Sequence, residues 1–395
     1  MAMRTGNFDF IEVVRSIKGV LPSGRNSFPL HEPEFSDQEL RHVRECIESG
    51  WVSYLGSHVE RFEDAIANVV GRNFVISTVS GTAGLHLSLV ALGVGEGDEV
   101  LTPALTFVAT ANSIALSGAT PNFIDSDPET LGVDVEALKR YLLEVARPRA
   151  DGKGIINRKT GNPITAIMPV HILGHPTDDD EIAAIARSYG LDIILDATES
   201  LGSRYKDVPA ARNGLIAVLS FNGNKIITTG GGGAVLTDDM NLASRLRHIA
   251  ATAQITSGWN TKHDAIGFNY RMPALNAALG LGQIQQLDNF VKRKRRLADL
   301  YRAAIAGVDG VKFVEEPCYA TSNYWLNAIY VENEFPKGRD DLLKALHDEH
   351  ILCRPAWTPM HMLEMYKDVP RARLTGAEEV ARRLIQLPSG PGLVL

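Results

Sequence analysis

Several short segments carry residue types that suit anion binding or acid–base and amine chemistry. The segment Ser80-Gly81-Thr82-Ala83 stands between a predicted strand and a predicted helix. Free backbone N–H groups and the helix dipole favour an anion at such a point, and Gly81 lets the backbone approach it closely. Thr82 adds a hydroxyl group. The plain alternative is an ordinary helix N-cap at Thr82.

A carboxylate and a lysine follow two further predicted strands. Asp196 comes directly after the apolar run 191–195, where it suits a helix cap, a metal ligand or a partner for a cationic ring nitrogen. Lys225 ends the segment 220–225 and precedes the glycine run 230–233. It suits a Schiff-base amine, a phosphate clamp or a surface lysine. The phosphate clamp fails on spacing, because no G-x-x-x-x-G-K-[ST] pattern is present.

An aromatic residue completes the set. Phe107 stands just after a predicted strand, where a ring either stacks on a flat ligand or joins the core. Ligands of open α/β sheets bind beyond the carboxyl ends of the strands, so these segments are expected at one edge. An anion nest, an aromatic plate, a carboxylate and an amine match the phosphate, ring, ring nitrogen and aldehyde of pyridoxal 5′-phosphate. No metal site is expected, because His347 and His350 lack a His-Glu-x-x-His pattern.

The elements that position these residues alternate between strands and helices. Short apolar runs such as 74–78 and 191–195 predict buried strands, and amphipathic stretches such as 135–145 predict helices. This alternation predicts an α/β fold with a mostly parallel central sheet covered by helices. We expect three parts, which are an N-terminal arm (1–33), a large cofactor-binding domain (34–290) and a smaller C-terminal α+β domain (291–395).

Local sequence signals predict where two helices begin and which face of a third helical stretch is exposed. Capping boxes are expected at Ser36 and at Ser57, each with Glu three residues on. The stretch 273–305 has a helical pattern throughout. Its basic run, 292–296, is expected to lie on a solvated helix face.

Composition excludes several classes of protein. The 395 residues carry 40 Lys+Arg against 47 Asp+Glu, a net charge of −7, which gives no basic field for nucleic acid. A hydrophobic content of 45% excludes disorder as the main state. No apolar run approaches the roughly 18 residues that span a bilayer, and the N-terminus lacks a signal-peptide core. Cys46, Cys318 and Cys353 are too few and too scattered for a disulfide framework, so we expect a cytoplasmic protein.

From about residue 35 to residue 395, the sequence resembles the DegT-type sugar aminotransferases, which use pyridoxal phosphate and have the aspartate aminotransferase fold (fold type I). Any one shared segment is weak evidence, but eight in the family's order are specific. These segments are 48–53, 80–83, 97–100, 106–110, 196–199, 220–225, 267–272 and 354–357.

The resemblance implies roles for the central residues. Lys225 is the amine that joins the cofactor aldehyde and then carries a proton. Asp196 pairs with the pyridine N–H, and Phe107 stacks on the ring. Glu199 stands where many members carry Gln beside the cofactor 3-oxygen. An ionised Glu199 would repel that oxygen, so either Glu199 is protonated or its contact differs.

The same resemblance implies roles for residues that surround the cofactor and the substrate. Besides Gly81, the groups expected to hold the phosphate are Thr82, Ala83 and Ser220. Asn269 is expected to reach the phosphate from the other subunit, which implies a homodimer with shared active sites. The sugar and nucleotide are expected near Trp51, Ser53, Arg354 and His361.

The implied reaction is transamination of a nucleotide-linked keto-6-deoxy sugar for surface polysaccharides, with glutamate as donor and pyridoxamine 5′-phosphate formed half-way. The segments 8–11 and 196–200 resemble the branch that feeds legionaminic-type nonulosonic acids. We therefore expect C4 amination of UDP-linked 4-keto-6-deoxy-N-acetylglucosamine. The alternatives are a GDP-perosamine-type or a dTDP-3-keto-sugar aminotransferase and, more remotely, a non-catalytic regulator.

Overall fold

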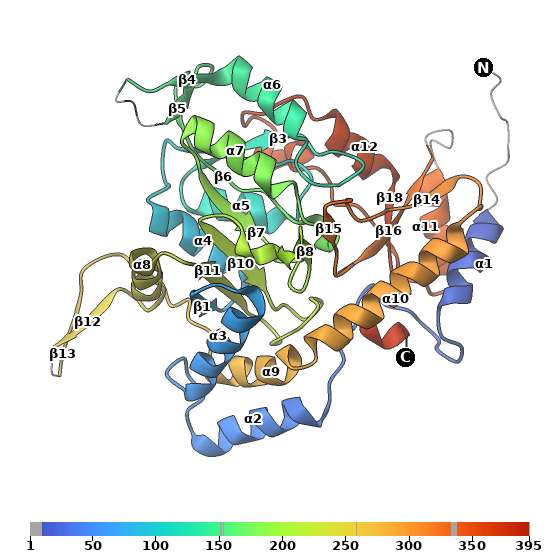
Figure 1. Ribbon diagram of the computed structural model, residues 1–395, viewed down its shortest axis with the longest axis horizontal. Coiled ribbons are helices and arrows are strands. Elements are labelled where there is room, and N and C mark those ends of the chain that lie inside the picture. The colour runs from blue at the N-terminus through green and yellow to red at the C-terminus, as the bar shows by residue number, and fades with distance from the viewer. Residues whose placement is uncertain (1–9, 151, 153, 258, 333–337, 395) are drawn as a thin grey trace.

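The computed structural model describes residues 10–394 except 151, 153, 258 and 333–337. Within these residues a nine-stranded sheet forms the centre, with the main order β1-β11-β10-β7-β6-β2-β3 (Figure 1). Strands β10, β7, β6, β2 and β3 run parallel, whereas β11 is antiparallel to both β1 and β10. The predicted mostly parallel α/β sheet is thus confirmed. The main-path strands are β1 (Phe74–Thr78), β2 (Glu99–Pro103), β3 (Thr120–Ile124), β6 (Pro163–Ile167), β7 (Asp192–Asp196), β10 (Ile216–Ser220) and β11 (Gly233–Thr237).

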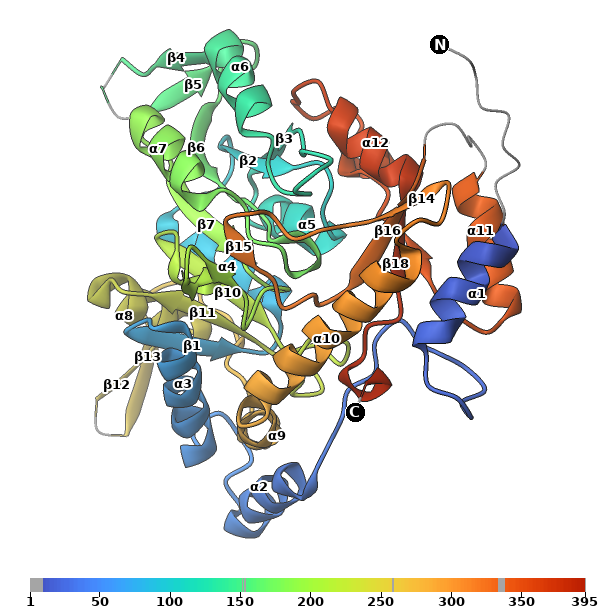
Figure 2. The same cartoon turned by 45° about the vertical axis from the view of Figure 1, so that its right-hand side comes forward.

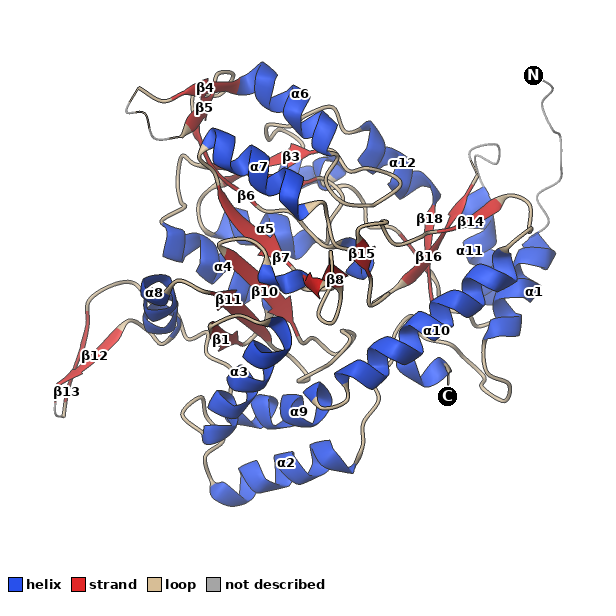
Figure 3. Cartoon of the chain, viewed as in Figure 1, coloured by secondary structure: helices blue, strands red, loops and turns tan. Residues whose placement is uncertain are grey.

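Both faces of this sheet are covered by helices (Figure 3). Successive strand residues point to opposite faces. In β10, Ala217 and Leu219 join a buried cluster with α3 and α9, while Ile216 and Val218 join another with α4 and α8. Apolar residues are therefore needed on both faces of the strand, which explains the continuous apolar run 216–219. The large-domain helices are α2 (Asp37–Ser49), α3 (Ser57–Val70), α4 (Gly81–Leu92), α5 (Val108–Leu116), α6 (Val135–Val145), α7 (Asp179–Tyr189), α8 (Met240–Ala250) and α9 (Ala274–Ile284).

A second, antiparallel sheet lies in the C-terminal part, in the order β14-β16-β18-β17 (Figure 2). The long helix α10 joins the two parts. Leu287 and Phe290 pack in the core of the large sheet, whereas Leu297 and Tyr301 pack in the core of the small one. The predicted boundary after residue 290 stays a prediction, and α10 runs through it. These elements are α10 (Leu287–Ile305), α11 (Gly338–Asp348), α12 (Thr375–Arg383), β14 (Val311–Phe313), β16 (Asn327–Val331), β17 (Arg354–Pro355) and β18 (Leu384–Leu387).

Shorter strands form further pairs outside the main order of the large sheet. The β12–β13 hairpin projects from the body at the lower left of Figure 1. None of these short pairs was predicted, because segments of two to four residues carry too few apolar positions to show a period. They are β4 (Ala146–Pro148), β5 (Ile155–Asn157), β8 (Arg204–Tyr205), β9 (Val208–Pro209), β12 (Gln254–Ser257), β13 (Asn260–His263) and β15 (Ala320–Thr321).

The N-terminal arm is more regular than expected. Helix α1 (Phe10–Val20) buries Val13 and Ile17 completely, in the same cluster as Tyr301 of α10. Val13 and Ile17 are four residues apart, as on one face of a helix. The turn-forming residues that follow in the arm obscured this spacing in the sequence. Phe8 and Asp9, part of the N-terminal segment used in the family comparison, lie outside the described residues.

One capping box is confirmed and one is wrong. The Ser36 hydroxyl accepts from the Gln38 N–H, and the Glu39 carboxylate accepts from the Ser36 N–H. Helix α3 instead has Gly56 as its N-cap without a side-chain cap, so Ser57 is already helical. A Cβ at Gly56 would lie 2.6 Å from the carbonyl oxygen of Trp51, which leaves room there only for glycine.

The stretch 273–305 is helical as expected, and it forms two helices, α9 and α10, with a break at residues 285–286. The expectation for its basic run is wrong. The basic run is not a uniformly solvated face, because Lys294 is 0% exposed. Arg293 and Arg295 form ion pairs with Glu34 and Glu316. A sequence pattern places these residues on a helix but does not show which chain segments later cover it.

Candidate active site

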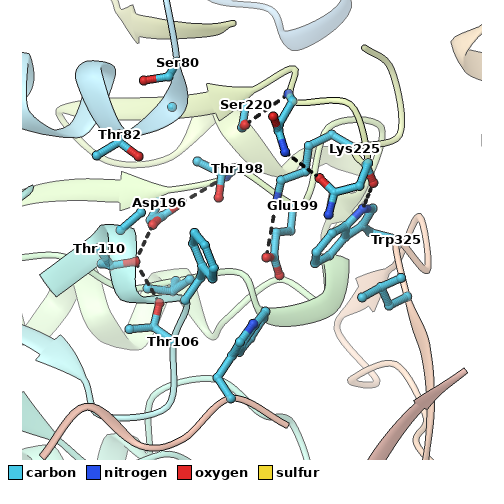
Figure 4. A pocket seen from close by; sticks show the side chains of 18 of the residues that line it. Ser80, Thr82, Thr106, Thr110, Asp196, Thr198, Glu199, Ser220, Lys225 and Trp325 are labelled. Carbon is cyan, nitrogen blue, oxygen red and sulfur yellow. Dashed lines mark hydrogen bonds and ion pairs between the residues drawn. The ribbon is translucent and has the colours of Figure 1, made fainter. Parts of the chain in front are cut away.

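A cavity of about 690 Å³ opens at the sheet edge where β1, β7 and β10 end and β11 begins. Figure 4 shows side chains from several loops converging on it. The sequence-predicted residues that line this pocket are Gly81, Thr82, Phe107, Asp196, Glu199, Ser220, Lys225 and Arg354.

The start of α4 forms an anion nest, defined by Ser80, Gly81 and Thr82. The first N–H groups of a helix have no partner within the helix, and they carry the positive end of its dipole. A Cβ added at Gly81 would lie 3.0 Å from Cβ of Ser220, and one at Gly233 would lie 2.6 Å from the nest backbone. The nest is therefore tightly enclosed, and a side chain at either glycine would fill it. Ala83 lies outside the pocket lining, and its N–H donates to the Ser80 hydroxyl (3.0 Å).

Asp196 ends β7 as a nearly buried carboxylate, 3% exposed. Its Oδ2 accepts from the Thr110 hydroxyl at 2.8 Å, and its Oδ1 accepts from the Thr198 N–H at 3.2 Å. The Thr110 hydroxyl is in turn 2.7 Å from that of Thr106. These two donors orient the carboxylate, which leaves it able to pair with a cationic ring nitrogen.

Lys225 lies on the other side of the pocket from Asp196, with Glu199 between them (Figure 4). Lys225 Nζ is 3.2 Å from Oε1 of Glu199. The other carboxylate oxygen, Oε2, accepts from the Leu173 N–H at 2.8 Å. Burial raises the pKa of the Glu199 carboxyl, against the opposing charge of Lys225. Each Glu199 oxygen thus has a partner within the chain, which is the Leu173 N–H for Oε2 and the Lys225 amine for Oε1.

Phe107 is the N-cap residue of α5 and is 53% exposed on the pocket side. Its ring meets that of Trp357 edge to face, with centroids 6.4 Å apart. A half-exposed aromatic ring in a pocket offers a stacking face, which is the predicted role. The other interpretation, that Phe107 simply joins the core, does not agree with this exposure.

Besides Ala83, four predicted residues lie outside the pocket lining. Asn269, Trp51 and Ser53 are exposed on the surface of this chain. Asn269 was expected to act in the other subunit's site, so its position here leaves that role a prediction. Nε2 of His361 instead lies 3.1 Å from Glu378, an ion-pair distance if the histidine is protonated.

Sequence reasoning missed several side chains that line the pocket. Thr110 and Trp357 fall within segments that support the resemblance, but no role was assigned to them. Trp325 comes just before β16 of the small sheet, and its indole N–H donates to the Asn224 carbonyl at 2.7 Å. No local pattern marked Trp325, because only the packing of the two sheets brings it to Lys225.

Comparison with known proteins identifies the family of the chain. A model of the DegT/DnrJ/EryC1/StrS aminotransferase family matches residues 33–395. The chain belongs to this family. A GDP-perosamine synthase of Escherichia coli O157:H7 is 37% identical over 367 residues, covering 92% of this chain and 94% of that protein. EpsN of Bacillus subtilis (strain 168), named as a pyridoxal phosphate-dependent aminotransferase, is 35% identical over 368 residues, covering 92% and 91%. The solved structure of DesI in the presence of its TDP-sugar product has a TM-score of 0.82 at 27% identity, covering 97% and 92%.

As a member of the DegT family, the protein is a pyridoxal phosphate-dependent aminotransferase. When bound, this cofactor supplies an electron sink for negative charge that develops at the substrate carbon. The pocket suits it, because the anion nest is enclosed by two glycines, a carboxylate lies on one side and an amine lies on the other. No helix in the described part of the chain is long and apolar enough to cross a bilayer.

Proposed function

We propose that this protein transfers the amino group of glutamate to a nucleotide-linked 4-keto-6-deoxy sugar, with Lys225 as the reacting amine. The observation that carries the proposal is the placement of Lys225 and Asp196 on opposite sides of one pocket (Figure 4). A planar cofactor with an aldehyde and a ring nitrogen at its two ends needs this arrangement. The anion nest provides the third point, which fixes the phosphate and hence the rotation of the ring.

Each residue then has one task. The nest binds the phosphate, together with Ser220, and the Phe107 ring covers one face of the cofactor. Asp196 holds a proton on the ring nitrogen, and the Thr110 hydroxyl keeps its carboxylate oriented. With the cofactor bound, Lys225 Nζ would take the proton from the donor carbon in the first half-reaction and would deliver a proton to the sugar carbon in the second. One amine alternating between base and acid serves both halves of the reaction.

The nucleotide is the least constrained part of the substrate. The 37% identity to a GDP-perosamine synthase favours a GDP-linked sugar over the UDP-linked N-acetyl sugar that the sequence first suggested. Arg354 supports a diphosphate at the pocket mouth, because it lines the pocket, is exposed, and makes no ion pair among the described residues. Arginine binds phosphate through two parallel hydrogen bonds.

A homodimer with shared sites accompanies this proposal. Apolar side chains stand exposed along α2 and the loop after it, including Leu40, Ile47, Leu55 and Trp51, which is 60% exposed. A contiguous exposed apolar surface typically marks a protein interface. We place the reaction in the cytoplasm, where the three cysteines, unpaired in the structure, remain reduced.

A substrate panel tests the function. Purified protein loaded with pyridoxal phosphate is mixed with glutamate and with GDP-, UDP- or dTDP-linked keto sugars, and the amine products are identified by mass spectrometry. We expect turnover with the GDP-linked 4-keto sugar and none after Lys225→Ala. Preference for the UDP-linked N-acetyl sugar would instead support C4 amination of UDP-linked 4-keto-6-deoxy-N-acetylglucosamine, as the sequence first suggested. Failure of glutamate to bleach the cofactor's visible absorbance would refute the proposed activity.

A further inference from the structure

The indole ring of Trp325 lies against the amine of Lys225. Lys225 Nζ is 3.9 Å from the ring centroid, within the range in which the negative face of an aromatic ring attracts an ammonium. Glu199 Oε1 contacts the same nitrogen at 3.2 Å. The side chains of Lys225 and Glu199 are only 12% and 3% exposed, so water screens these contacts little. The amine nitrogen is therefore held between a carboxylate oxygen and the electron-rich face of an aromatic ring.

Hydrogen bonds on several sides hold Trp325 in place. Its indole N–H donates to the Asn224 carbonyl (2.7 Å), and its backbone N–H donates to Oδ1 of Asn323 (2.7 Å). Its carbonyl accepts from Lys294 Nζ at 3.0 Å. The buried Asn323 amide also donates to the Glu199 carbonyl at 2.9 Å. One side chain therefore fixes the backbone of both groups that contact the Lys225 amine.

We propose that Glu199 and Trp325 form an ammonium site, in which the Lys225 amine rests with its extra proton whenever it is not bonded to the cofactor. Trp325 is the new assignment, as a positioning residue that acts through Lys225. The inference rests on the proposed role of Lys225 and deepens it. It also gives Glu199 a partner other than the cofactor 3-oxygen.

The ammonium site controls where one proton lies. In the Lys225–Glu199 pair, the proton can move from Nζ to Oε1, which breaks one N–H bond and forms one O–H bond without changing the net charge. The transfer frees the lone pair of Nζ for attack on an aldehyde or a C–H bond. The Trp325 ring opposes it, because the ring attracts an ammonium and not a neutral amine. Trp325 thereby sets the fraction of Lys225 that is ready to react.

Two other titratable groups interact with the Lys225–Glu199 pair and stay constant in a test on Trp325. Asp196 adds negative charge near Glu199. His31 interacts electrostatically with Lys225 and Lys294, and both of its ring nitrogens are buried without a hydrogen-bond partner among the described residues. Burial, followed by these two lysines, lowers the pKa of His31, so it stays neutral near pH 7.

The test measures the protonation of Lys225 in protein loaded with pyridoxamine 5′-phosphate, where the amine is free. A trace of an acylating reagent labels Lys225 at each pH, and the labelled peptide is quantified by mass spectrometry. Trp325→Leu should lower the labelling midpoint by about one pH unit, and Trp325→Phe by roughly half as much. Trp357→Leu removes another tryptophan of the same pocket and should leave the midpoint unchanged. An unchanged midpoint in Trp325→Leu, or an equal shift in both leucine variants, would overturn the proposal.

A second measurement decides the matter if Trp325→Leu does not fold. Ring-fluorinated tryptophans withdraw electrons from the aromatic face with little change of shape. The midpoint should fall stepwise with the number of fluorines, but not in a Trp325→Phe background. A labelling midpoint that stays the same across the fluorinated series would overturn the proposed ammonium site. Borohydride reduction of the protein loaded with pyridoxal phosphate separates the two proposals, because missing attachment at Lys225 would refute the proposed function instead.

Discussion

Replacing Lys294 by methionine should remove a pH-dependent cost of folding. Lys294 is fully buried, with Nζ donating to the carbonyls of Trp325 and Ser389, and no ion pair to it is found in the described part of the chain. Burial lowers its pKa from 10.5 to about 7. Between these two values the unfolded chain binds more protons than the folded chain, so stability rises with pH.

The magnitude follows from the two pKa values. A pKa of 10.5 when unfolded and about 7 when folded corresponds to a penalty of about 5 kcal/mol below pH 7. From pH 7 to pH 9 that penalty falls by about 2 kcal/mol. Methionine has no charge to bury, but it leaves two carbonyl groups unpaired at about 1–3 kcal/mol each, independent of pH. The stability of the wild type relative to Lys294→Met should therefore improve by about 2 kcal/mol across this interval.

Urea unfolding at pH 7, 8 and 9, followed by tryptophan fluorescence, measures this difference. Lys292→Met is the matched control, because Lys292 lies on the same helix and is exposed. Its difference from the wild type should not depend on pH. A constant difference for Lys294→Met would show that Lys294 keeps an ordinary pKa in the fold, and the burial argument would be refuted.

Three further changes test the site. Thr110→Val removes the hydroxyl that donates to Asp196 and should weaken cofactor retention about five-fold, measured by spectroscopic titration, with Thr110→Ser retaining tight binding. Gly233→Ala would place its Cβ 2.6 Å from the anion nest, so it should lower both the melting temperature and cofactor occupancy, whereas Gly231→Ala, with its nearest atom at 4.0 Å, should change neither. Arg354→Ala should raise KM for the nucleotide sugar about ten-fold with kcat within about two-fold, measured by steady-state kinetics.

The positions of the central site residues followed from the sequence because they depend on local rules. A polar residue that ends a buried strand lies at the sheet edge, as for Asp196 at the end of β7 and Ser220 at the end of β10. Helix α6 has the bounds that its periodicity predicted, 135–145, because its apolar face and its cap at Asp134 are contained within one segment.

The residues that the sequence did not reveal depend on contacts between distant segments. Trp325 reaches Lys225 from the small domain, through hydrogen bonds with Asn224 and Asn323. Lys294 looks like its basic neighbours in the sequence, and its Nζ finds buried partners only in the carbonyls of Trp325 and Ser389, which lie far along the chain. Neither contact leaves a periodic signal in the segment that contains it.

The reversed direction of β11 has a consequence for how the reactive lysine can vary. The chain leaves the sheet at Ser220 and returns at Gly233 on the same edge, and the Phe221 N–H donates to the Gly232 carbonyl (2.9 Å) to close the ends. Lys225 therefore lies on a loop whose two ends are held together by this hydrogen bond and by the pairing of β10 with β11. Insertion or deletion of a single residue there would displace the nitrogen directly, whereas the projecting β12–β13 hairpin is free to lengthen. We expect natural variants to keep the length of the first loop and to change that of the second.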